Sequence, residues 1–224
     1  MRRALVTGAS RRIGLAAAAV RALERDGWEV VTAGFPPRDV GDAREVDIQD
    51  DISDPDAPSR IFDAAGDMTA LIMAHAHSEH GGVLSTNVEN FDRHLAVNAR
   101  GSMLLMAEFA RRFRGDRGSI VSYTSDAVVD EVAYGASKRA LDRITIAAAI
   151  ELAPLGITVN ALNPGPVDTG WMTPNLSAQI EERTPLGRLG RPEDSAELVA
   201  FLCSPGGGWI TGQILRCDGG ISLL

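Results

Sequence analysis

The stretch that decides the fold is Ala4-Leu5-Val6-Thr7-Gly8-Ala9-Ser10-Arg11-Arg12-Ile13-Gly14. Its first four residues are an apolar run that predicts a buried strand, which Gly8 ends. Residues 13–25 have the spacing of a helix that stops at Asp26-Gly27. The Gly-rich turn between them places backbone N–H groups and a helix N-terminus where a pyrophosphate can bind. We therefore expect a dinucleotide site here, with a purely conformational role for the glycines as the alternative.

The rest of the chain alternates apolar runs with helical patterns. Further strands are predicted at 28–33, 70–74, 118–123, 157–162 and 213–216, and helices at 55–64 (capped by Ser53 or Asp54), 88–113, 134–152 and 192–202. Strands that are apolar throughout are typical of a parallel sheet covered on both faces. We expect an α/β fold with a doubly wound parallel sheet and a ligand crevice at the carboxyl ends of its strands. The 224 residues suffice for one such domain (1–224) and are few for two.

Composition excludes several classes of partner. A net charge of −8 argues against nucleic acid, because phosphate binding needs a basic face. No apolar run approaches the roughly 18 residues of a membrane span, and the first strand leaves no room for a signal peptide, so a cytoplasmic location is expected. The acidic stretch 39–56 is interpreted as a solvated loop and helix start. Cys203 and Cys217 lack metal-ligand spacing, and we interpret Cys203 as a packing residue.

Tyr134 and Lys138 are the most informative pair of the chain. Four residues apart on a predicted helix, they share one face. A lysine ammonium beside a phenol favours the phenolate, so we expect Lys138 to lower the pKa of Tyr134. A tyrosine adjusted in this way can exchange a proton with a carbonyl or alcohol oxygen. Ser125, nine residues before Tyr134, could donate a hydrogen bond to the same substrate oxygen.

Two further segments have a functional and a structural interpretation. Asn98 lies in the middle of a predicted helix, where it is either a satisfied core amide or an amide that kinks the helix and holds a water for proton transfer. Residues 163–169 form a rigid Asn-Pro-Gly-Pro turn after a strand. This turn either terminates the strand or forms a wall against a nicotinamide, with Thr169 bonding the cofactor.

The choice of cofactor depends on the first turn and on the end of the second strand. Arg11 and Arg12 could form a guanidinium fork on a 2′-phosphate, or could be solvated. A cofactor with a free 2′-OH usually meets a carboxylate near the position of Gly34, and no acid follows until Asp39. The sequence therefore favours NADP(H) over NAD(H).

Three of the four histidines fall in one loop, at His75, His77 and His80, and the fourth is His94. Their spacing fits no metal-ligand set, so we predict no metal and expect a histidine along the cofactor or substrate channel. An apolar or mixed substrate pocket is one interpretation of a second group of residues, with ordinary packing as the equal alternative: Met73, Val128, Val132, Trp171 and Met172.

Almost the whole chain resembles the short-chain dehydrogenase/reductase superfamily, on the Thr-Gly turn, Asn98, the Ser125/Tyr134/Lys138 set, the Asn-Pro-Gly turn, residues 188–194 and residues 210–220. The resemblance is strongest to 3-oxoacyl-carrier-protein reductases and to sugar or polyol dehydrogenases. It implies a Rossmann sheet of about seven strands, a nicotinamide cofactor, and a homotetramer or homodimer. It also implies catalytic roles for Asn98, Ser125, Tyr134 and Lys138, and cofactor contacts from Gly8, Ser10, Arg11, Arg12, Ile13, Gly14, Asp51, Asn98, Tyr134, Lys138, Pro164, Gly165, Val167 and Thr169.

The chain also departs from the family pattern. Arg12 stands where a glycine or alanine is usual, and Met73-Ala74-His75-Ala76 replaces an Asn-Asn-Ala-Gly run whose amides normally brace the sheet. The loop between Ser125 and Tyr134 is short, which predicts an open substrate mouth, and residues 170–189 leave a small lid.

We therefore expect an NADP(H)-preferring oxidoreductase that interconverts a small-molecule ketone and a secondary alcohol, with Tyr134 as general acid/base. The alternatives are an NAD-dependent alcohol dehydrogenase of the same fold and a non-catalytic dinucleotide-binding regulatory protein.

Overall fold

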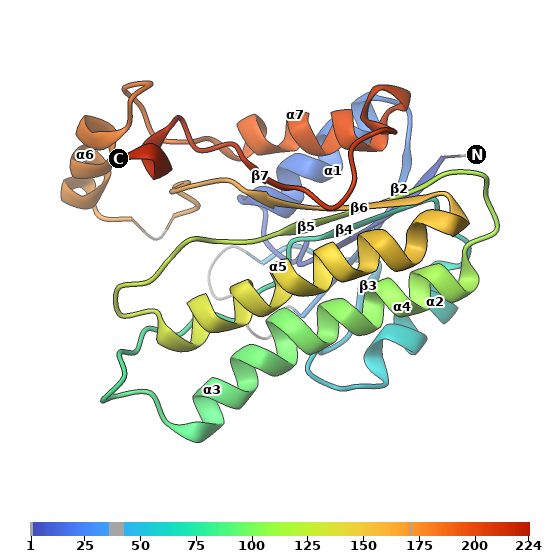
Figure 1. Cartoon of the computed structure of the whole chain (residues 1–224), viewed down its shortest axis with the longest axis horizontal. Coiled ribbons are helices and arrows are strands. Elements are labelled where there is room, and N and C mark those ends of the chain that lie inside the picture. Colours follow the sequence, from blue (N-terminus) through green and yellow to red (C-terminus); the bar gives the residue numbers. More distant parts are fainter. Residues whose placement is uncertain (1, 36–42, 171) are drawn as a thin grey trace.

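The molecule is built on one parallel sheet with the strand order β3-β2-β1-β4-β5-β6-β7 (Figure 1). The computed structural model describes residues 2–35, 43–170 and 172–224, so Asp39 and Trp171 lie outside the described residues. The strands are β1 (Arg3–Thr7), β2 (Glu29–Gly34), β3 (Ile48–Gln49), β4 (Ala70–Met73), β5 (Gly118–Tyr123), β6 (Ile157–Asn163) and β7 (Ile214–Arg216). All pairs are parallel, which confirms the predicted doubly wound sheet.

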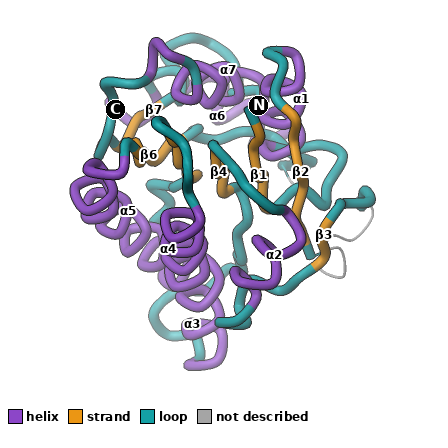
Figure 2. The backbone as a smooth tube through the Cα atoms, turned by 90° about the vertical axis from the view of Figure 1, so that its right-hand side faces the viewer, coloured by secondary structure: helices purple, strands orange, loops and turns teal. Residues whose placement is uncertain are grey.

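Helices cover both faces of this sheet (Figures 1 and 2). One face carries α1 (Leu15–Arg25) and α7 (Pro192–Cys203), and the other carries α2 (Ala57–Ala65), α4 (Ser102–Arg112) and α5 (Val132–Leu152). The remaining helical segments are α3 (Val88–His94), α6 (Pro174–Arg183), a π-helix at Leu95–Gly101 and three short 3₁₀ turns at Ala153–Leu155, Pro205–Gly207 and Ile221–Leu223. No helix in the described ranges is both long and apolar enough to cross a membrane.

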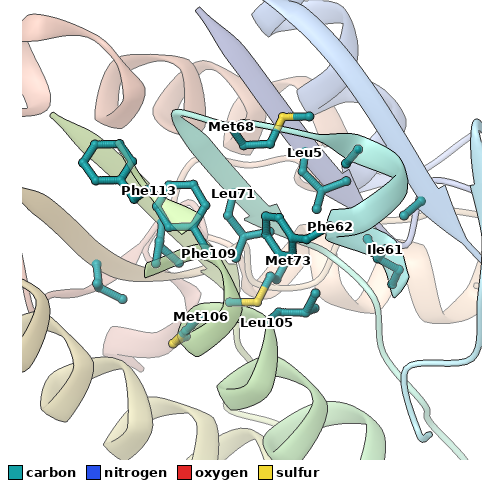
Figure 3. Close-up of a cluster of buried hydrophobic side chains, with 14 of the residues drawn as sticks. Leu5, Ile61, Phe62, Met68, Leu71, Met73, Leu105, Met106, Phe109 and Phe113 are labelled. Atoms are coloured by element: carbon teal, nitrogen blue, oxygen red, sulfur yellow. The ribbon is translucent and has the colours of Figure 1, made fainter. Parts of the chain in front are cut away.

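The side chains of β1 alternate between the two faces of the sheet, and the core is divided into two layers accordingly. Leu5 packs into the layer under α2, α4 and α5, whereas Ala4 and Val6 pack into the layer under α1 and α7. Figure 3 shows the first layer, in which Phe62 and Phe109 lie against the strand side chains. Because both faces are buried, every residue of β4 and β5 is buried, as the continuous apolar runs predict.

Three predicted segments differ from the structure. β3 lies inside the acidic stretch predicted as a loop, and pairs with β2 through only two residues; so short an edge strand has no detectable period. The helix predicted from residue 55 begins at Ala57, because the Asp54 carboxylate accepts a hydrogen bond from the Asp56 N–H in a preceding turn. Residues 170–189, expected to be a small lid, contain α6, whose first turn is capped by the Thr173 hydroxyl.

The helix predicted over residues 88–113 is divided by the π-helix at Leu95–Gly101. Gly101 ends this turn against Ile52, where a Cβ atom would lie 2.2 Å from Ile52 Cγ2. Asn98 lies at the centre of this π-helix, so the regular helix is interrupted at the residue where a kink was one of two expectations.

Phe109 provides a test of the core. It is 1% exposed, its ring centroid lies 5.6 Å from that of Phe113, and Phe62 is 6.3 Å away. We expect Phe109→Ala to lower the free energy of unfolding by about 3–5 kcal/mol, through lost burial and the cavity it leaves. Urea denaturation followed by circular dichroism measures this change. Phe201→Ala is the matched control, because Phe201 is 46% exposed; an equal loss for both variants would contradict this account of the core.

Candidate active site

A cleft of about 970 Å³ lies at the carboxyl ends of the strands, where the crevice was predicted. Its volume is at the upper end of the range of small-molecule and cofactor sites. It brings together residues from the first turn, the loops after β4 and β5, the start of α5 and the turn after β6. Its lining includes these predicted site residues: Gly8, Ser10, Arg11, Ile13, Gly14, Asp51, Ser125, Tyr134, Lys138, Pro164, Gly165, Val167 and Thr169.

The first turn is shaped to admit a ligand close to the backbone. Gly8 has φ +76°, and a Cβ atom there would lie 2.4 Å from the His75 backbone nitrogen, so only glycine fits between β1 and β4. Gly14 precedes α1 with φ +152° and has no neighbouring atom within 4 Å of a built Cβ. The N-terminus of α1 therefore meets open space at the cleft, which fits the diphosphate of a dinucleotide.

The two arginines of this turn lie in different places. Arg11 reaches across the cleft, and its Nη2 donates to the Thr169 carbonyl at 2.9 Å. Arg12 lies outside the cleft lining as described, and its Nε donates to the Ala43 carbonyl at 3.3 Å. The structure thus does not bring the two guanidinium groups together as the fork that the sequence suggested. Arg11 instead joins the first turn to the loop after β6.

Asp51 lines the cleft from the loop after β3. Burial opposes its ionisation, but hydrogen bonds from Ser53 and Arg93 outweigh this and hold the pKa of Asp51 below its usual value. Arg93 Nη2 donates to the Asp51 carboxylate at 2.8 Å. The carboxylate is therefore ionised and fixed in orientation where the resemblance implies an adenine contact.

Ser125, Tyr134 and Lys138 meet at the cleft. Ser125 and Tyr134 both line the cleft despite the short interval between them, and the Ser125 hydroxyl acts on the phenol to lower its pKa. The Lys138 ammonium lies 5.6 Å from the centroid of the Tyr134 ring and donates to the Tyr123 carbonyl at 2.8 Å. This last bond ties the first turns of α5 to the end of β5, the strand that Ser125 follows.

The net outcome expected for Tyr134, a pKa lowered by the neighbouring Lys138, is wrong for this structure. Burial raises the pKa of Tyr134 to about 12, opposed by the hydrogen bond with Ser125, and the charge of Glu131 raises it further. Burial also lowers the pKa of Lys138 to about 8, partly offset by Asp142. Sequence spacing places the two side chains on one face, but it does not show the loss of water around them, and that loss dominates both pKa values.

Asn98 is fully buried beneath the cleft and lies outside its described lining. Its Oδ1 accepts from the His77 N–H at 2.7 Å, and its Nδ2 donates to the His77 carbonyl and to Ser137 Oγ, each at 2.9 Å. Both donors of the amide are therefore used. The Asn98 side chain therefore holds the loop after β4 against α5. A water bound to Asn98 would have to donate a hydrogen bond to one of the oxygens of Asn98.

His75 is the site residue whose role the sequence did not reveal. Its Nδ1 lies 2.7 Å from Thr7 Oγ1 and its Nε2 lies 3.1 Å from Ser102 Oγ, so the ring joins the end of β1 to the start of α4. The imidazole thus braces the sheet where the family pattern has amides. Burial and the nearby Lys138 charge lower the pKa of His75 to about 3, so the ring is neutral.

The other histidines surround the substrate end of the cleft. His77 and His80 line it, as expected for a histidine along the channel. The buried His94 ring lies 4.5 Å from that of His77 and 6.4 Å from that of Tyr134, measured between centroids. His94 Nδ1 faces the Asn90 carbonyl and its Nε2 accepts from the Glu79 N–H, which defines the Nδ1–H tautomer. Within the described residues, no three potential ligands are arranged to hold a metal ion.

The predicted apolar substrate pocket is not present among the described residues. Met73 is buried in the core layer under α4, and Val128 is 75% exposed. Val132 and Met172 also lie outside the described cleft lining. The packing interpretation holds for Met73, since the last residue of a buried strand points into the core. The cleft lining as described combines apolar side chains with histidine, serine and carboxylate side chains.

Comparisons with known proteins agree with this architecture. A family model described as enoyl-(acyl carrier protein) reductase matches residues 8–222. The chain is 40% identical to the uncharacterized oxidoreductase YjdA of Bacillus subtilis over 186 residues, covering 80% of this chain and 74% of YjdA. It is 34% identical to the chloroplastic NADPH-dependent aldehyde reductase-like protein of Arabidopsis thaliana, covering 79% of this chain and 72% of that protein.

A solved structure gives the same result. The angucycline C-6 ketoreductase LanV with bound NADP matches with a TM-score of 0.89 and 27% identity, covering 100% of this chain and 96% of LanV. The chain belongs to the short-chain dehydrogenase/reductase superfamily. It is accordingly an NAD(P)-dependent oxidoreductase.

The His75 brace makes stability depend on acidity. The folded-state pKa of His75, about 3, lies below its unfolded value of about 6.5. The neutral ring therefore contributes its full stability above about pH 6.5, and this contribution is lost as the pH falls from there toward 3. We expect His75→Asn, which keeps a short hydrogen-bonding side chain, to weaken this acid dependence relative to the wild type. Urea midpoints at pH 7.5 and pH 5 measure it; identical pH slopes for both proteins would contradict the assignment.

Proposed function

We propose that the protein uses NADPH to reduce a carbonyl compound to an alcohol, a ketone giving a secondary alcohol, with Tyr134 as the proton donor. The observation that carries this proposal is the meeting of Ser125, Tyr134 and Lys138 at one end of a dinucleotide-sized cleft whose other end holds the Gly8–Gly14 turn. A pure binding protein has no need of that constellation.

The bound nicotinamide would supply a hydride to the carbonyl carbon. The hydroxyls of Ser125 and Tyr134, two residues that line the same cleft, would bind and orient the carbonyl oxygen. With its pKa near 12, the Tyr134 phenol is neutral at physiological pH, which is the state that donates a proton. Lys138, charged below about pH 8, would stabilise the phenolate left behind.

The remaining residues would position the cofactor. Asn98 would hold the loop that follows β4 and is the candidate anchor for a relay water. Asp51 would contact the adenine. Pro164, Gly165, Val167 and Thr169, in the turn after β6, would form the wall beside the nicotinamide. The Arg11 side chain reaches from the first turn to the Thr169 carbonyl, beside the place where the diphosphate would bind. Arg11 would therefore contact the cofactor.

Preference for NADP(H) rests on two kinds of support. The relative from Arabidopsis is named as NADPH-dependent, and LanV was solved with NADP. In this chain, β2 ends at Gly34, and in the sequence no acidic residue follows until Asp39, so the strand end itself lacks the carboxylate that would bind a 2′-OH. Arg12 lies beside Ala43, on the segment that returns from β2, where a 2′-phosphate would approach. An NAD-dependent alcohol dehydrogenase is the alternative.

Removal of the Tyr134 hydroxyl tests the mechanism. We expect Tyr134→Phe to lower kcat/KM for carbonyl reduction by at least about a hundredfold, because a positioned proton donor contributes that much. The dissociation constant for NADPH should change little. Tyr123→Phe is the control, since the Tyr123 hydroxyl bonds Ser195 on α7 and, among the described residues, no side chain of the proposed mechanism. Full turnover by Tyr134→Phe would contradict the mechanism. NADPH binding by a wild type that reduces no aldehyde or ketone would favour a regulatory protein.

Fluorescence titration tests the cofactor. We expect tighter binding of NADPH than of NADH, and a smaller difference for Arg12→Ala, because that variant removes a charge that attracts the 2′-phosphate. Arg21→Ala is the control, because Arg21 pairs with Glu193 on α7. Tighter NADH binding by the wild type would replace this proposal with the NAD-dependent alternative.

A further inference from the structure

Asp126 is the residue that follows Ser125 at the cleft, and its carboxylate is held by two arginines from different parts of the fold. Its Oδ1 accepts a hydrogen bond from Nη2 of Arg139, which lies on α5. Its Oδ2 accepts from Nε of Arg216, at the end of β7, at 3.3 Å, and lies 3.2 Å from Nη2 of the same arginine. The helix that carries Lys138 and the last strand of the sheet therefore meet at the side chain next to Ser125.

Arg139 is itself held in place. Its Nη1 donates to Asp142 Oδ2 at 2.9 Å, three positions further along α5, and the Asp142 side chain is only 8% exposed. An isolated ion pair at the surface contributes little, because two long side chains must be ordered to form it. Here a buried carboxylate on the same helix already orients the guanidinium, so less ordering remains for its bond to Asp126.

The short loop after Ser125 has little apolar packing of its own. Val128 and Val129 are 75% and 84% exposed. The loop instead lies close to the backbone of α5, since a Cβ atom at Gly135 would be 2.5 Å from the Ala127 carbonyl oxygen. The Ala127 N–H also donates to the Ser125 hydroxyl oxygen at 3.1 Å. The position of that hydroxyl is thus coupled to the two residues that follow it.

We propose that Asp126 is a positioning residue of the reaction, whose two ion pairs fix the Ser125 hydroxyl in the cleft. This inference rests on the carbonyl reduction proposed above and adds a residue that acts through Ser125. Both carboxylate oxygens of Asp126 are bonded to arginines, so the side chain is suited to holding the loop and not to exchanging a proton with a substrate.

Asp126→Asn tests the proposal, because asparagine keeps the shape, removes the charge and turns one acceptor oxygen into a donor that faces an arginine. We measure kcat/KM with NADPH on three probes, benzaldehyde, cyclohexanone and 2,3-butanedione. We expect a loss of about 10- to 100-fold, because a reacting group that is misplaced by about 1 Å can cost that much. The dissociation constant for NADPH, measured by fluorescence, should not change.

The measurement specific to a positioning role is a double-mutant cycle with Ser125→Ala. Without the serine hydroxyl there is nothing left for the carboxylate to position. Adding Asp126→Asn to Ser125→Ala should therefore lower kcat/KM by less than about twofold. A general structural role would instead lower kcat/KM by the same factor in both backgrounds.

Arg216→Gln is the second variant, since it removes one of the two ion pairs and leaves the carboxylate in place. We expect a smaller loss of kcat/KM than for Asp126→Asn, and again no further loss in the Ser125→Ala background. This cycle also provides the measurement if Asp126→Asn does not fold.

Glu108→Gln is the matched control. Glu108 also lies between two arginines, with Oε1 on Arg112 and Oε2 on Arg111, and its side chain is 15% exposed. It belongs to α4 and lies outside the cleft lining as described. Loss of this paired carboxylate should leave kcat/KM at the wild-type value.

Four results would overturn the assignment. Wild-type kcat/KM in Asp126→Asn means that the ion pairs do not fix the serine, and equal losses in both backgrounds mean that Asp126 has a structural role only. Wild-type turnover by Ser125→Ala removes the assignment but leaves proton donation by Tyr134 standing. If the wild type reduces none of the probes, the proposed function fails first and the positioning role fails with it.

Discussion

The parallel direction of all seven strands is the constraint on which this protein depends. Because no strand runs the other way, every loop that follows a strand opens on the same edge of the sheet. The first turn, the loop with His75, the end of β5 with Ser125 and the turn after β6 come from four parts of the chain, yet they enclose one cleft. Because helices cover both faces of the sheet, the side chains of these four segments meet at this edge.

Buried hydrogen bonds then hold that edge in shape. His75 joins β1 to α4, Asn98 joins the following loop to α5, and the Lys138 ammonium joins α5 to the last carbonyl of β5. Each of these polar groups is buried and satisfied, which is the condition for such a network to rigidify a site. The walls of the cleft are therefore built from helix and strand ends that these hydrogen bonds hold together.

Burial also sets the chemistry of the site. Removing water favours the neutral form of both members of the tyrosine–lysine pair, raising one pKa and lowering the other. The charge of Glu131 raises the pKa of Tyr134 further.

The sequence by itself determined the order of the main strands and helices, the parallel sheet and most of the predicted residues that line the cleft. These follow from local periodicity, from glycines at required positions and from a four-residue spacing that places Tyr134 and Lys138 on one face. Only the tertiary structure decided the His75 bridge, the reach of Arg11 to Thr169, the edge strand β3 and the positions of Arg12 and Asn98 outside the described cleft lining. Those features depend on which segments become neighbours and on how much water they lose, and neither quantity is encoded in the spacing of residues along one element.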